Sequence, residues 1–526
     1  MSTTETEAAA PAARPAHQEI NKWGATITVT LGMIATIMAS TMINVAIADI
    51  MGAYGVGQDR VHWLMTGFLT ATTVCMLLNA WFVRNLGPRN TFIIASVLFA
   101  ISSIMGQLAP TFETVLLARV VQGSCAGLIQ PLGLNVIFMA FPLHERGKAM
   151  GMFGFGVMIG PSIGPALGGV IVDVVDWHYV FTGALPFMAL GALMAARYLP
   201  GRSDDLPKAR LNWVSFLLVA GSVSMFLNGI SSGQREGWSS VTVLSLLLFS
   251  ALAAIAVIEL ECRTKYPLLN VRLFTYRTFL VTSLVGFIFG AGMFGTFYLM
   301  PIFVRTIQGY TGTETGLLLL VVNLPSFPMY PIAGWISHRF KAVYPIVTGM
   351  SLFGLSAFAL SVIDVNTGFW YMGLWGSLAM IGLALIMPAL SSVALQELDR
   401  DLLPYGAGTL TFIRMLGGAM GVNCLALVLD HRTARHGEFY AATQTAESGA
   451  TADVLFPVMD LLAEHGLTYG EQWSMAYLYL GRMVAAQASS LAFQDAYMVL
   501  TVAFAVAIAI TIVALRGAGA VGAMVS

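Results

Sequence analysis

The stretch that decides the fold lies between residues 119 and 169, in two consecutive apolar segments. The first contains Arg119-Val120-Val121-Gln122-Gly123, and the second reads Gly156-x-x-x-Gly160-Pro161-x-x-Gly164-Pro165-x-x-Gly168-Gly169. Residues three and four apart share a helix face, so Arg119 and Gln122 point in one direction. A charge inside a membrane helix is expensive and normally turns toward a protein interior or a watery cavity. We therefore predict that Arg119 and Gln122 line an internal cavity.

The second segment combines a glycine ridge with two prolines. Glycines recur every four residues at 156, 160, 164 and 168, with Gly169 beside the last. Such a ridge lets a neighbouring helix backbone approach closely. Pro161 and Pro165 each remove a backbone donor and are expected to bend the helix. This pattern predicts a bent, tightly packed helix next to the one that carries Arg119.

Composition places the chain among membrane proteins. Its 526 residues are 57% hydrophobic and 10% charged, whereas a soluble domain carries about 25% charged residues. The formal net charge of -1 gives no indication of nucleic-acid binding. The sequence contains no nucleotide-binding loop, no metal-binding cysteine pair and no metalloprotease motif. We therefore expect a protein that is not an enzyme and has neither a cofactor nor a metal.

Fourteen segments have the roughly 20 mostly apolar residues that a bilayer-spanning helix needs. Basic residues gather in cytoplasmic loops, and most of the 26 in this chain fall on one side if both termini are cytoplasmic. The predicted spans are 25–49, 63–82, 90–108, 114–140, 147–174, 179–199, 212–230, 241–261, 280–304, 315–337, 343–363, 369–396, 405–429 and 495–515.

The motifs in the fourth and fifth spans resemble those of the major facilitator superfamily, the fifth being typical of its antiporter branch. The resemblance to its fourteen-span drug:proton antiporters, the EmrB/QacA-type permeases, covers nearly the whole chain and includes Arg414-Met415-Leu416-Gly417-Gly418-Ala419-Met420-Gly421 in the thirteenth span. It implies an all-α membrane protein with two six-helix bundles and two inserted helices. The corresponding regions are a disordered tail (1–22), an N-terminal bundle (23–200), the inserted pair (211–262) and a C-terminal bundle (278–516) that includes a periplasmic segment (431–494).

Two short loops resemble the superfamily's Gly-x-Leu-Ala-Asp-Arg-x-Gly-Arg-Arg loop, which implies a cytoplasmic gate. The first contains Arg84, Gly87 and Arg89, and the second contains Gly334 and Arg339. Arg84 and His338 stand where the family has its acid, so the charge-dipole latch of that acid does not transfer. A short basic loop that only follows the orientation rule is the alternative.

The family's first-span motif, Leu-Asp-x-Thr-Ile-x-Asn-Val-Ala, here keeps Thr41 and Asn44 but has Ala39 in place of the acid. No Asp or Glu lies deep in any predicted span. We therefore expect a positively biased substrate cavity, which favours neutral or anionic compounds over cations. Its candidate residues are Thr41, Asn44, Arg119, Gln122 and Arg414.

Proton coupling is implied by the resemblance and needs a group that titrates. Because Arg does not release its proton at working pH, the candidates are Asp49, His62, Asp173 or the bound substrate. The alternative for each side chain is an ordinary polar residue at the membrane interface.

The resemblance implies a multi-pass inner-membrane transporter that exports small hydrophobic compounds in exchange for protons, as in multidrug efflux and antibiotic resistance. It also implies a periplasmic adaptor and an outer-membrane channel as partners, which segment 431–494 would contact. Helical spacing at Asp453–Ala463 and Trp473–Ala486 predicts helices there, and an inert amphipathic cap is the alternative role. Rival functions are an importer or a lipid or fatty-acid translocator of the same fold, and a non-transporting receptor or assembly factor.

Overall fold

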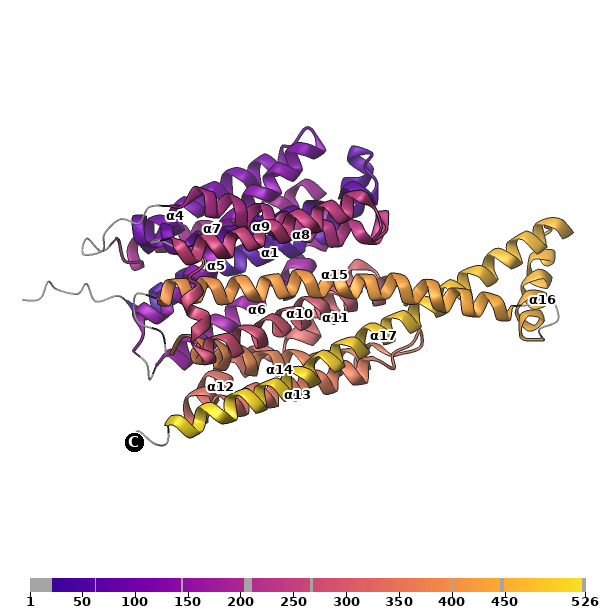
Figure 1. Cartoon of the computed structure of the whole chain (residues 1–526). Coiled ribbons are helices and arrows are strands. Elements are labelled where there is room, and N and C mark those ends of the chain that lie inside the picture. Colours follow the sequence, from indigo (N-terminus) through magenta and orange to yellow (C-terminus); the bar gives the residue numbers. More distant parts are fainter. Residues whose placement is uncertain are drawn as a thin grey trace, which may run out of the picture.

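A computed structural model describes residues 21–61, 63–142, 145–202, 211–264, 268–396, 398, 402–444 and 449–522, and this part of the chain is built from helices (Figure 1). Twelve of the described helices are long and apolar enough to cross a membrane, and two shorter apolar helices cover Trp63–Met76 and Ile159–Val174. The shorter two coincide with the second and fifth predicted spans. The predicted all-α membrane fold is confirmed. The disordered tail predicted for residues 1–22 lies outside the described residues, except for its last two.

The two halves of the chain repeat one set of helix contacts. In the first half α1 packs on α5, α6 and α7, and in the second half α10 packs on α14, α15 and α17. The first half comprises α1 (Lys22–Tyr54), α2 (Gln58–Val61), α3 (Trp63–Met76), α4 (Asn79–Gln107), α5 (Phe112–Ala140), α6 (Arg146–Val174), η1 (Trp177–Phe181) and α7 (Leu185–Tyr198). The second half comprises η2 (Val271–Thr275), α10 (Arg277–Thr306), α11 (Gly312–Asn323), α12 (Ser326–Arg339), α13 (Val343–Leu360), α14 (Phe369–Gln396), α15 (Leu403–Thr443), α16 (Gly449–Glu464) and α17 (Tyr469–Gly522).

Two predicted spans are interrupted. The second breaks between α3 and α4, and the side chain of Asn79 just after the break donates to the Leu128 carbonyl of α5 at 2.7 Å and accepts from Asn135 at 2.7 Å. The tenth breaks between α11 and α12 at Leu324–Pro325. Proline has no backbone N–H to continue a helix, so this second break has a local cause. At the first break the amide pair of Asn79 and Asn135 anchors the start of α4 to α5.

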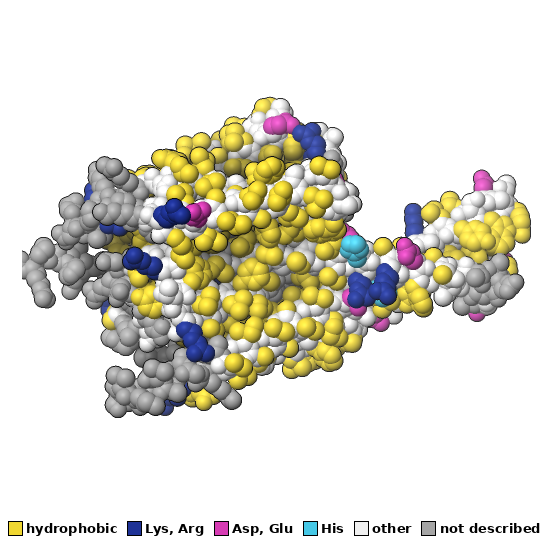
Figure 2. All heavy atoms as spheres, viewed as in Figure 1, with side chains coloured by type: hydrophobic (Ala, Val, Ile, Leu, Met, Phe, Trp, Pro, Cys, Tyr) yellow, Lys and Arg dark blue, Asp and Glu magenta, His cyan; other side chains and the backbone are white. Residues whose placement is uncertain are grey.

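Helices α8 (Trp213–Glu236) and α9 (Val241–Arg263) form a separate pair. The hydroxyls of Ser222 and Ser250 donate to each other's backbone carbonyls, at 3.1 and 2.9 Å. Val219 and Val223 of α8 belong to an apolar cluster with Val74 of α3 and with α15, so the pair covers a place where the two halves meet. Figure 2 shows hydrophobic side chains across this flank of the molecule, as expected of a surface in lipid.

Helices α15 and α17 extend past the helical body as a long arm, with α16 folded against α17 near its tip (Figure 1). From Tyr469 to Gln494 the extension of α17 measures about 38 Å at 1.5 Å per residue. Asp495 fastens the base of the arm, because it lies 2.9 Å from His436 Nε2 and 3.4 Å from Arg432 Nε, both on α15. The helices predicted at 453–463 and 473–486 are confirmed as parts of α16 and α17.

Candidate functional site

Arg119 lies inside the first half and is almost fully enclosed by protein, with 1% of its surface exposed. Its Nη1 donates to the Ala39 carbonyl and to Gln122 Oε1, both at 3.0 Å, and its Nε donates to the Leu64 carbonyl at 3.3 Å. The guanidinium carbon lies 4.2 Å from the centre of the Phe68 ring. The guanidinium therefore ties α5 to α1 and α3.

This network corrects the cavity-lining position that we predicted for Arg119 and Gln122. Gln122 has no exposed surface, and its Nε2 donates to the Ser103 hydroxyl of α4 at 2.9 Å. Gly123 makes the arrangement possible because a side chain there would collide with the Phe68 carbonyl of α3. The close approach of α3 and α5 brings the Leu64 carbonyl of α3 within reach of Arg119. Both side chains therefore stabilise the packing of the first half.

The glycine ridge of α6 packs along α1. Side chains at 156, 160, 164 and 168 would meet Thr30, Ile37, Thr41 and Met42 in turn, one helical turn after another. Pro161 and Pro165 lie inside α6 between these contacts. Gly169 differs from the ridge, because a Cβ there would lie 3.9 Å from Val45, an ordinary contact distance.

The second half contains a matching glycine seam between α10 and α15. A Cβ on Gly417 would collide with the Phe287 carbonyl, and one on Gly290 would collide with the Arg414 carbonyl. Thus the fifth helix of each half lies against the first through glycines, and the backbone of Arg414 is fixed against α10.

Thr41 and Asn44 lie in different surroundings on α1. The half-buried Thr41 hydroxyl donates to the Ile37 and Met38 carbonyls, at 3.2 Å each, and faces Gly164. Asn44 is exposed and forms no hydrogen bond with any residue that the structure describes. Of the two, Asn44 is therefore the one with an amide available to a ligand.

Arg414 is half-buried in α15, about 16 Å along the helix from Leu403 at 1.5 Å per residue. Its side chain forms no hydrogen bond with any residue that the structure describes. Tyr330 has no exposed surface, and its ring contacts Gly154 of α6, in the other half. Tyr330 of α12 thus lies where the two halves meet, and α15, the helix that carries Arg414, also contacts α3 and α5 of the first half.

The first of the two predicted gating loops is fastened to the end of α7. Arg89 donates through Nε to the Leu199 carbonyl at 2.8 Å and through its backbone N–H to the Pro200 carbonyl at 3.1 Å. Gly87 has φ 80° and ψ 162°, a conformation nearly restricted to glycine, and its α-carbon lies against the backbone of Arg202. Arg84 is half-buried.

In the second loop Gly334 is buried, while the exposed Arg339 lies over the Trp335 ring at 5.4 Å. The side chain of His338 is outside the described residues, so the structure gives no partner for the position at which the family has its acid.

Two of the three candidates for proton coupling lie among the described residues. Asp49 near the end of α1 and Asp173 near the end of α6 are both exposed, and His62 lies outside the described residues. One acid of the described spans is buried, Glu261 at the end of α9, which accepts from the Leu269 backbone N–H at 3.3 Å. Glu261 belongs to the separate pair of helices α8 and α9.

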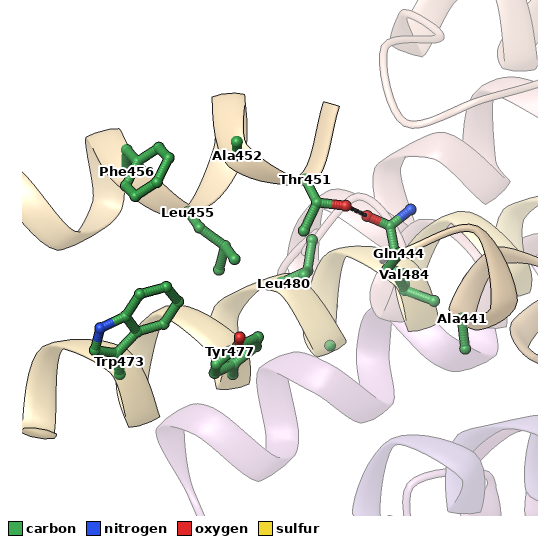
Figure 3. A pocket seen from close by; sticks show the side chains of 11 residues that line it. Ala441, Gln444, Thr451, Ala452, Leu455, Phe456, Trp473, Tyr477, Leu480 and Val484 are labelled. Atoms are coloured by element: carbon green, nitrogen blue, oxygen red, sulfur yellow. Dashed lines mark hydrogen bonds between the residues drawn. The ribbon is translucent and has the colours of Figure 1, made fainter. Parts of the chain in front are cut away.

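The tip of the arm carries aromatic side chains around a cavity of about 310 Å³. Trp473 and Tyr477 of α17 face Leu455 and Phe456 of α16 across it, and Thr451 donates to Gln444 at one end (Figure 3). Trp473 stacks on Tyr477 with ring centres 5.3 Å apart. Since Phe456, Tyr469 and Tyr477 are each more than half exposed, the tip presents an apolar surface to solvent.

Sequence reasoning missed Tyr330 and Ser103. Tyr330 stands among the apolar residues of a predicted span and is not part of any motif. Only its contact with Gly154 shows that it lies between the two halves. Ser103 is one of several small polar residues in its span. A buried Gln on a neighbouring helix requires a partner, but the sequence does not indicate which residue supplies it.

Comparisons with known proteins agree with this architecture. The sequence profile described as Major Facilitator Superfamily matches residues 29–422. The uncharacterized MFS-type transporter YhcA of Bacillus subtilis is 26% identical over 478 residues, which cover 90% of this chain and 89% of YhcA. The multidrug transporter protein MdtP of the same organism is 26% identical over 77% of this chain and 74% of MdtP. The crystal structure of the human organic anion transporter MFSD10 superposes with a TM-score of 0.59 at 14% identity, over 92% of this chain and 99% of that chain, and so shares the fold.

Proposed function

We propose that this chain, which belongs to the Major Facilitator Superfamily, exports small hydrophobic compounds across the inner membrane by alternating access. The similarity to MdtP, a protein named as a multidrug transporter, supports export of such compounds. The matched contacts of α1 with α6 and of α10 with α15 support two bundles that move as units. Both termini lie in the cytoplasm in this proposal, as the distribution of basic residues favours.

The observation that carries the substrate preference is the charge within the spans. Among the described residues, the charged side chains far from both ends of a span are Arg119 and Arg414, and neither has a carboxylate beside it. Arg119 is enclosed by protein, so the half-buried Arg414 is the charge that can act on a pathway between the halves, and a positive charge there repels cations. The proposed substrates are therefore neutral or anionic rather than cationic.

Transport into inside-out vesicles tests the proposal. Hydrophobic fluorophores matched in size but cationic, neutral or anionic would be offered under an imposed pH gradient. We expect the neutral and anionic members to accumulate inside, since export becomes uptake in this orientation. Preferred uptake of a quaternary ammonium fluorophore would refute the substrate class, and release in place of uptake would indicate an importer.

We propose proton antiport as the energy source. Because Arg119 and Arg414 remain protonated at working pH, the coupling group in this proposal is Asp49, Asp173, His62 or the substrate itself. Three single variants, Asp49→Asn, Asp173→Asn and His62→Gln, identify the coupling group. Full pH-driven transport in all three variants would leave the substrate as the proton carrier.

We propose that the arm formed by α15, α16 and α17 binds a periplasmic adaptor that leads to an outer-membrane channel. Exposed aromatic side chains at a rigid tip, such as Tyr469 and Tyr477, are typical of protein interfaces. Replacing both by Ser is expected to reduce drug resistance of cells and to leave uptake by inside-out vesicles unchanged. A matched control replaces the exposed Val499 of α17, on the membrane-embedded part of the helix, by Ala. Loss of vesicle uptake in the tip variant would contradict a role in adaptor binding.

A further inference from the structure

The cavity at the tip of the arm lies outside the helical body and is shared by three helices (Figure 1). Its lining comes from the end of α15 at Ala441 and Gln444, from α16 and from α17, and its volume is about 310 Å³. An apolar cavity of about 150 Å³ is large enough to bind benzene, and small-molecule sites begin near about 300 Å³. The tip cavity therefore has room for a compound of two or three fused rings.

The walls of the cavity are held in place by a small apolar core. Leu455 and Met459 of α16 pack with Ala476 and Leu480 of α17, and all four side chains are buried. Leu455 and Leu480 also line the cavity, so this core continues directly into its walls. A ligand that enters preformed walls pays little for ordering side chains. The tip therefore has the rigidity that a small-molecule site requires.

The two ends of the cavity differ in chemistry. Phe456 and Trp473 stand at one end and Gln444 and Thr451 at the other (Figure 3). The Trp473 ring stacks on that of Tyr477 with an angle of 28° between their planes, which gives one broad aromatic surface. Aromatic rings attract other rings in offset-stacked or edge-to-face arrangements. This end therefore favours a flat aromatic ligand over an aliphatic chain.

The opposite end offers hydrogen bonds from one amide. Gln444 Oε1 accepts from the Thr451 hydroxyl at 2.8 Å, and Gln444 Nε2 donates to the Thr443 hydroxyl at 3.3 Å. A side-chain amide has two N–H donors and an oxygen with two lone pairs. One donor and one lone pair of Gln444 thus have no partner among the residues that the structure describes. They can bind one hydroxyl or carbonyl group of a ligand and so orient it.

The lining also specifies the charge of the ligand. None of the described residues that line the cavity is charged. A charged ligand would lose its hydration there without gaining a counter-charge. We infer that the tip cavity binds a neutral compound with two or three fused aromatic rings and one hydroxyl or carbonyl group. This ligand site lies outside the helical body and is additional to the proposed export pathway, on which it does not depend.

Photolabelling of the purified full chain in phosphatidylcholine nanodiscs tests the proposal. The probe is azidonaphthalene, and mass spectrometry of peptides locates the labelled residues. We expect labelled peptides from α16 and from the first turns of α17. Naphthol should suppress this labelling at lower concentration than naphthalene, and trimethylammonium-naphthalene should suppress it least. Labelled peptides from the spans serve as an internal reference for probe dissolved in the lipid.

Two neighbouring substitutions on α17 form a matched pair. Val484 is half-buried and lines the cavity, whereas Met483 is 44% exposed and does not line it. Val484→Trp fills the cavity and should reduce tip labelling about tenfold or more, while Met483→Trp should change it less than about twofold. Equal hydrogen exchange of α16 in Val484→Trp and the parent checks that the tip keeps its fold.

Two further variants test the two ends separately. Trp473→Leu keeps the site apolar but removes the stacking surface, and should weaken naphthol competition about twofold to tenfold. Gln444→Leu should abolish the advantage of naphthol over naphthalene. These two variants keep the proposal testable if Val484→Trp disturbs the tip.

Several results would overturn the proposal. They are absence of tip labelling in the parent, equal tip labelling in the parent and in folded Val484→Trp, and equal competition by naphthol and trimethylammonium-naphthalene. Tip labelling by a photoactivatable fatty acid in preference to azidonaphthalene would assign the cavity to an acyl chain and refute the aromatic class.

Uptake by inside-out vesicles separates this site from the proposed export. Uptake in the parent together with tip labelling that does not depend on Val484 would overturn the tip site and leave export standing. Tip labelling that is lost in Val484→Trp, in a parent chain that shows no uptake, would support the tip site and count against export.

Discussion

The glycine ridge of α6 gives a prediction that two neighbouring substitutions separate. Gly160 and Gly169 lie on the same helix, both are buried, and both have helical backbone angles. A Cβ on Gly160 would lie 2.8 Å from both Cβ and Cγ2 of Ile37, whereas one on Gly169 would lie 3.9 Å from Val45. We expect Gly160→Ala to destabilise the protein and Gly169→Ala to stabilise it.

The magnitude follows from two opposing terms. Alanine in place of glycine in a helix interior gains about 1 kcal/mol at either site. At 160 the contacted atoms belong to a β-branched side chain close to its own backbone, which cannot rotate away, so overpacking costs about 1–3 kcal/mol. The unfolding free energies of the two variants should therefore differ by about 1–3 kcal/mol, with Gly169→Ala the more stable.

Thermal melting of the detergent-solubilised proteins, followed by tryptophan fluorescence, together with denaturant titration in mixed micelles, measures this difference. Gly221→Ala in α8, where no atom lies within 4 Å of a Cβ, calibrates the helix term alone. If Gly160→Ala and Gly169→Ala have the same melting temperature, and it lies above that of the parent, then α1 and α6 are not in close contact. The packing described for the first half would then be incorrect.

Three further predictions concern stability. Arg119→Met should lower the unfolding free energy by about 1–3 kcal/mol, because Gln122 Oε1 loses its donor; an unchanged melting temperature would contradict the network. Gly87→Ala should lower the free energy of unfolding by about 2 kcal/mol or more, since it forces a non-glycine residue into φ 80° against the Arg202 backbone. Limited proteolysis should then cleave the loop faster, and an unchanged cleavage rate would contradict this prediction. Asp495→Asn should change the free energy of unfolding by less than about 1 kcal/mol. It should accelerate hydrogen exchange in α15 around His436, at the base of the arm. Equal exchange rates in the variant and the parent would show that His436 does not fasten the arm.

The sequence predicted the class of the fold because hydrophobic run length is set by the thickness of the bilayer and survives any detail of packing. It failed at the breaks in the second and tenth spans. Next to the first break, Asn79 is held by Leu128 and Asn135, which are far from it in sequence, and both Asn79 and Asn135 resemble other polar residues in spans. Pro325 gave a local signal at the second break, but a proline in an apolar run also fits a bent, continuous helix.

The sequence also could not distinguish the two intramembrane arginines. Helical spacing gives the face on which Arg119 and Gln122 lie, but not whether that face meets a cavity or a neighbouring backbone. Close approach of α3 at Gly123 decides this, and a single glycine in a span is too common to indicate it. The same spacing argument does not identify Tyr330 either, since its contact Gly154 belongs to another helix and is 176 positions earlier in the sequence.

The absence of an acid at position 39 has a structural consequence beyond the loss of one titratable group. Arg119 donates to the backbone carbonyl of Ala39 itself, so the position at which the family has its acid still compensates the guanidinium, but with a neutral dipole. A carboxylate there would cancel the charge, whereas a carbonyl stabilises it without cancelling it. The first half therefore keeps a fixed positive charge that does not respond to pH. Introducing Ala39→Asp should neutralise this charge and supply a titratable group beside Arg119, and we expect it to raise uptake of cationic fluorophores relative to anionic ones in inside-out vesicles. An unchanged ratio would mean that Arg119 lies too deep in the protein to influence which charge enters the pathway.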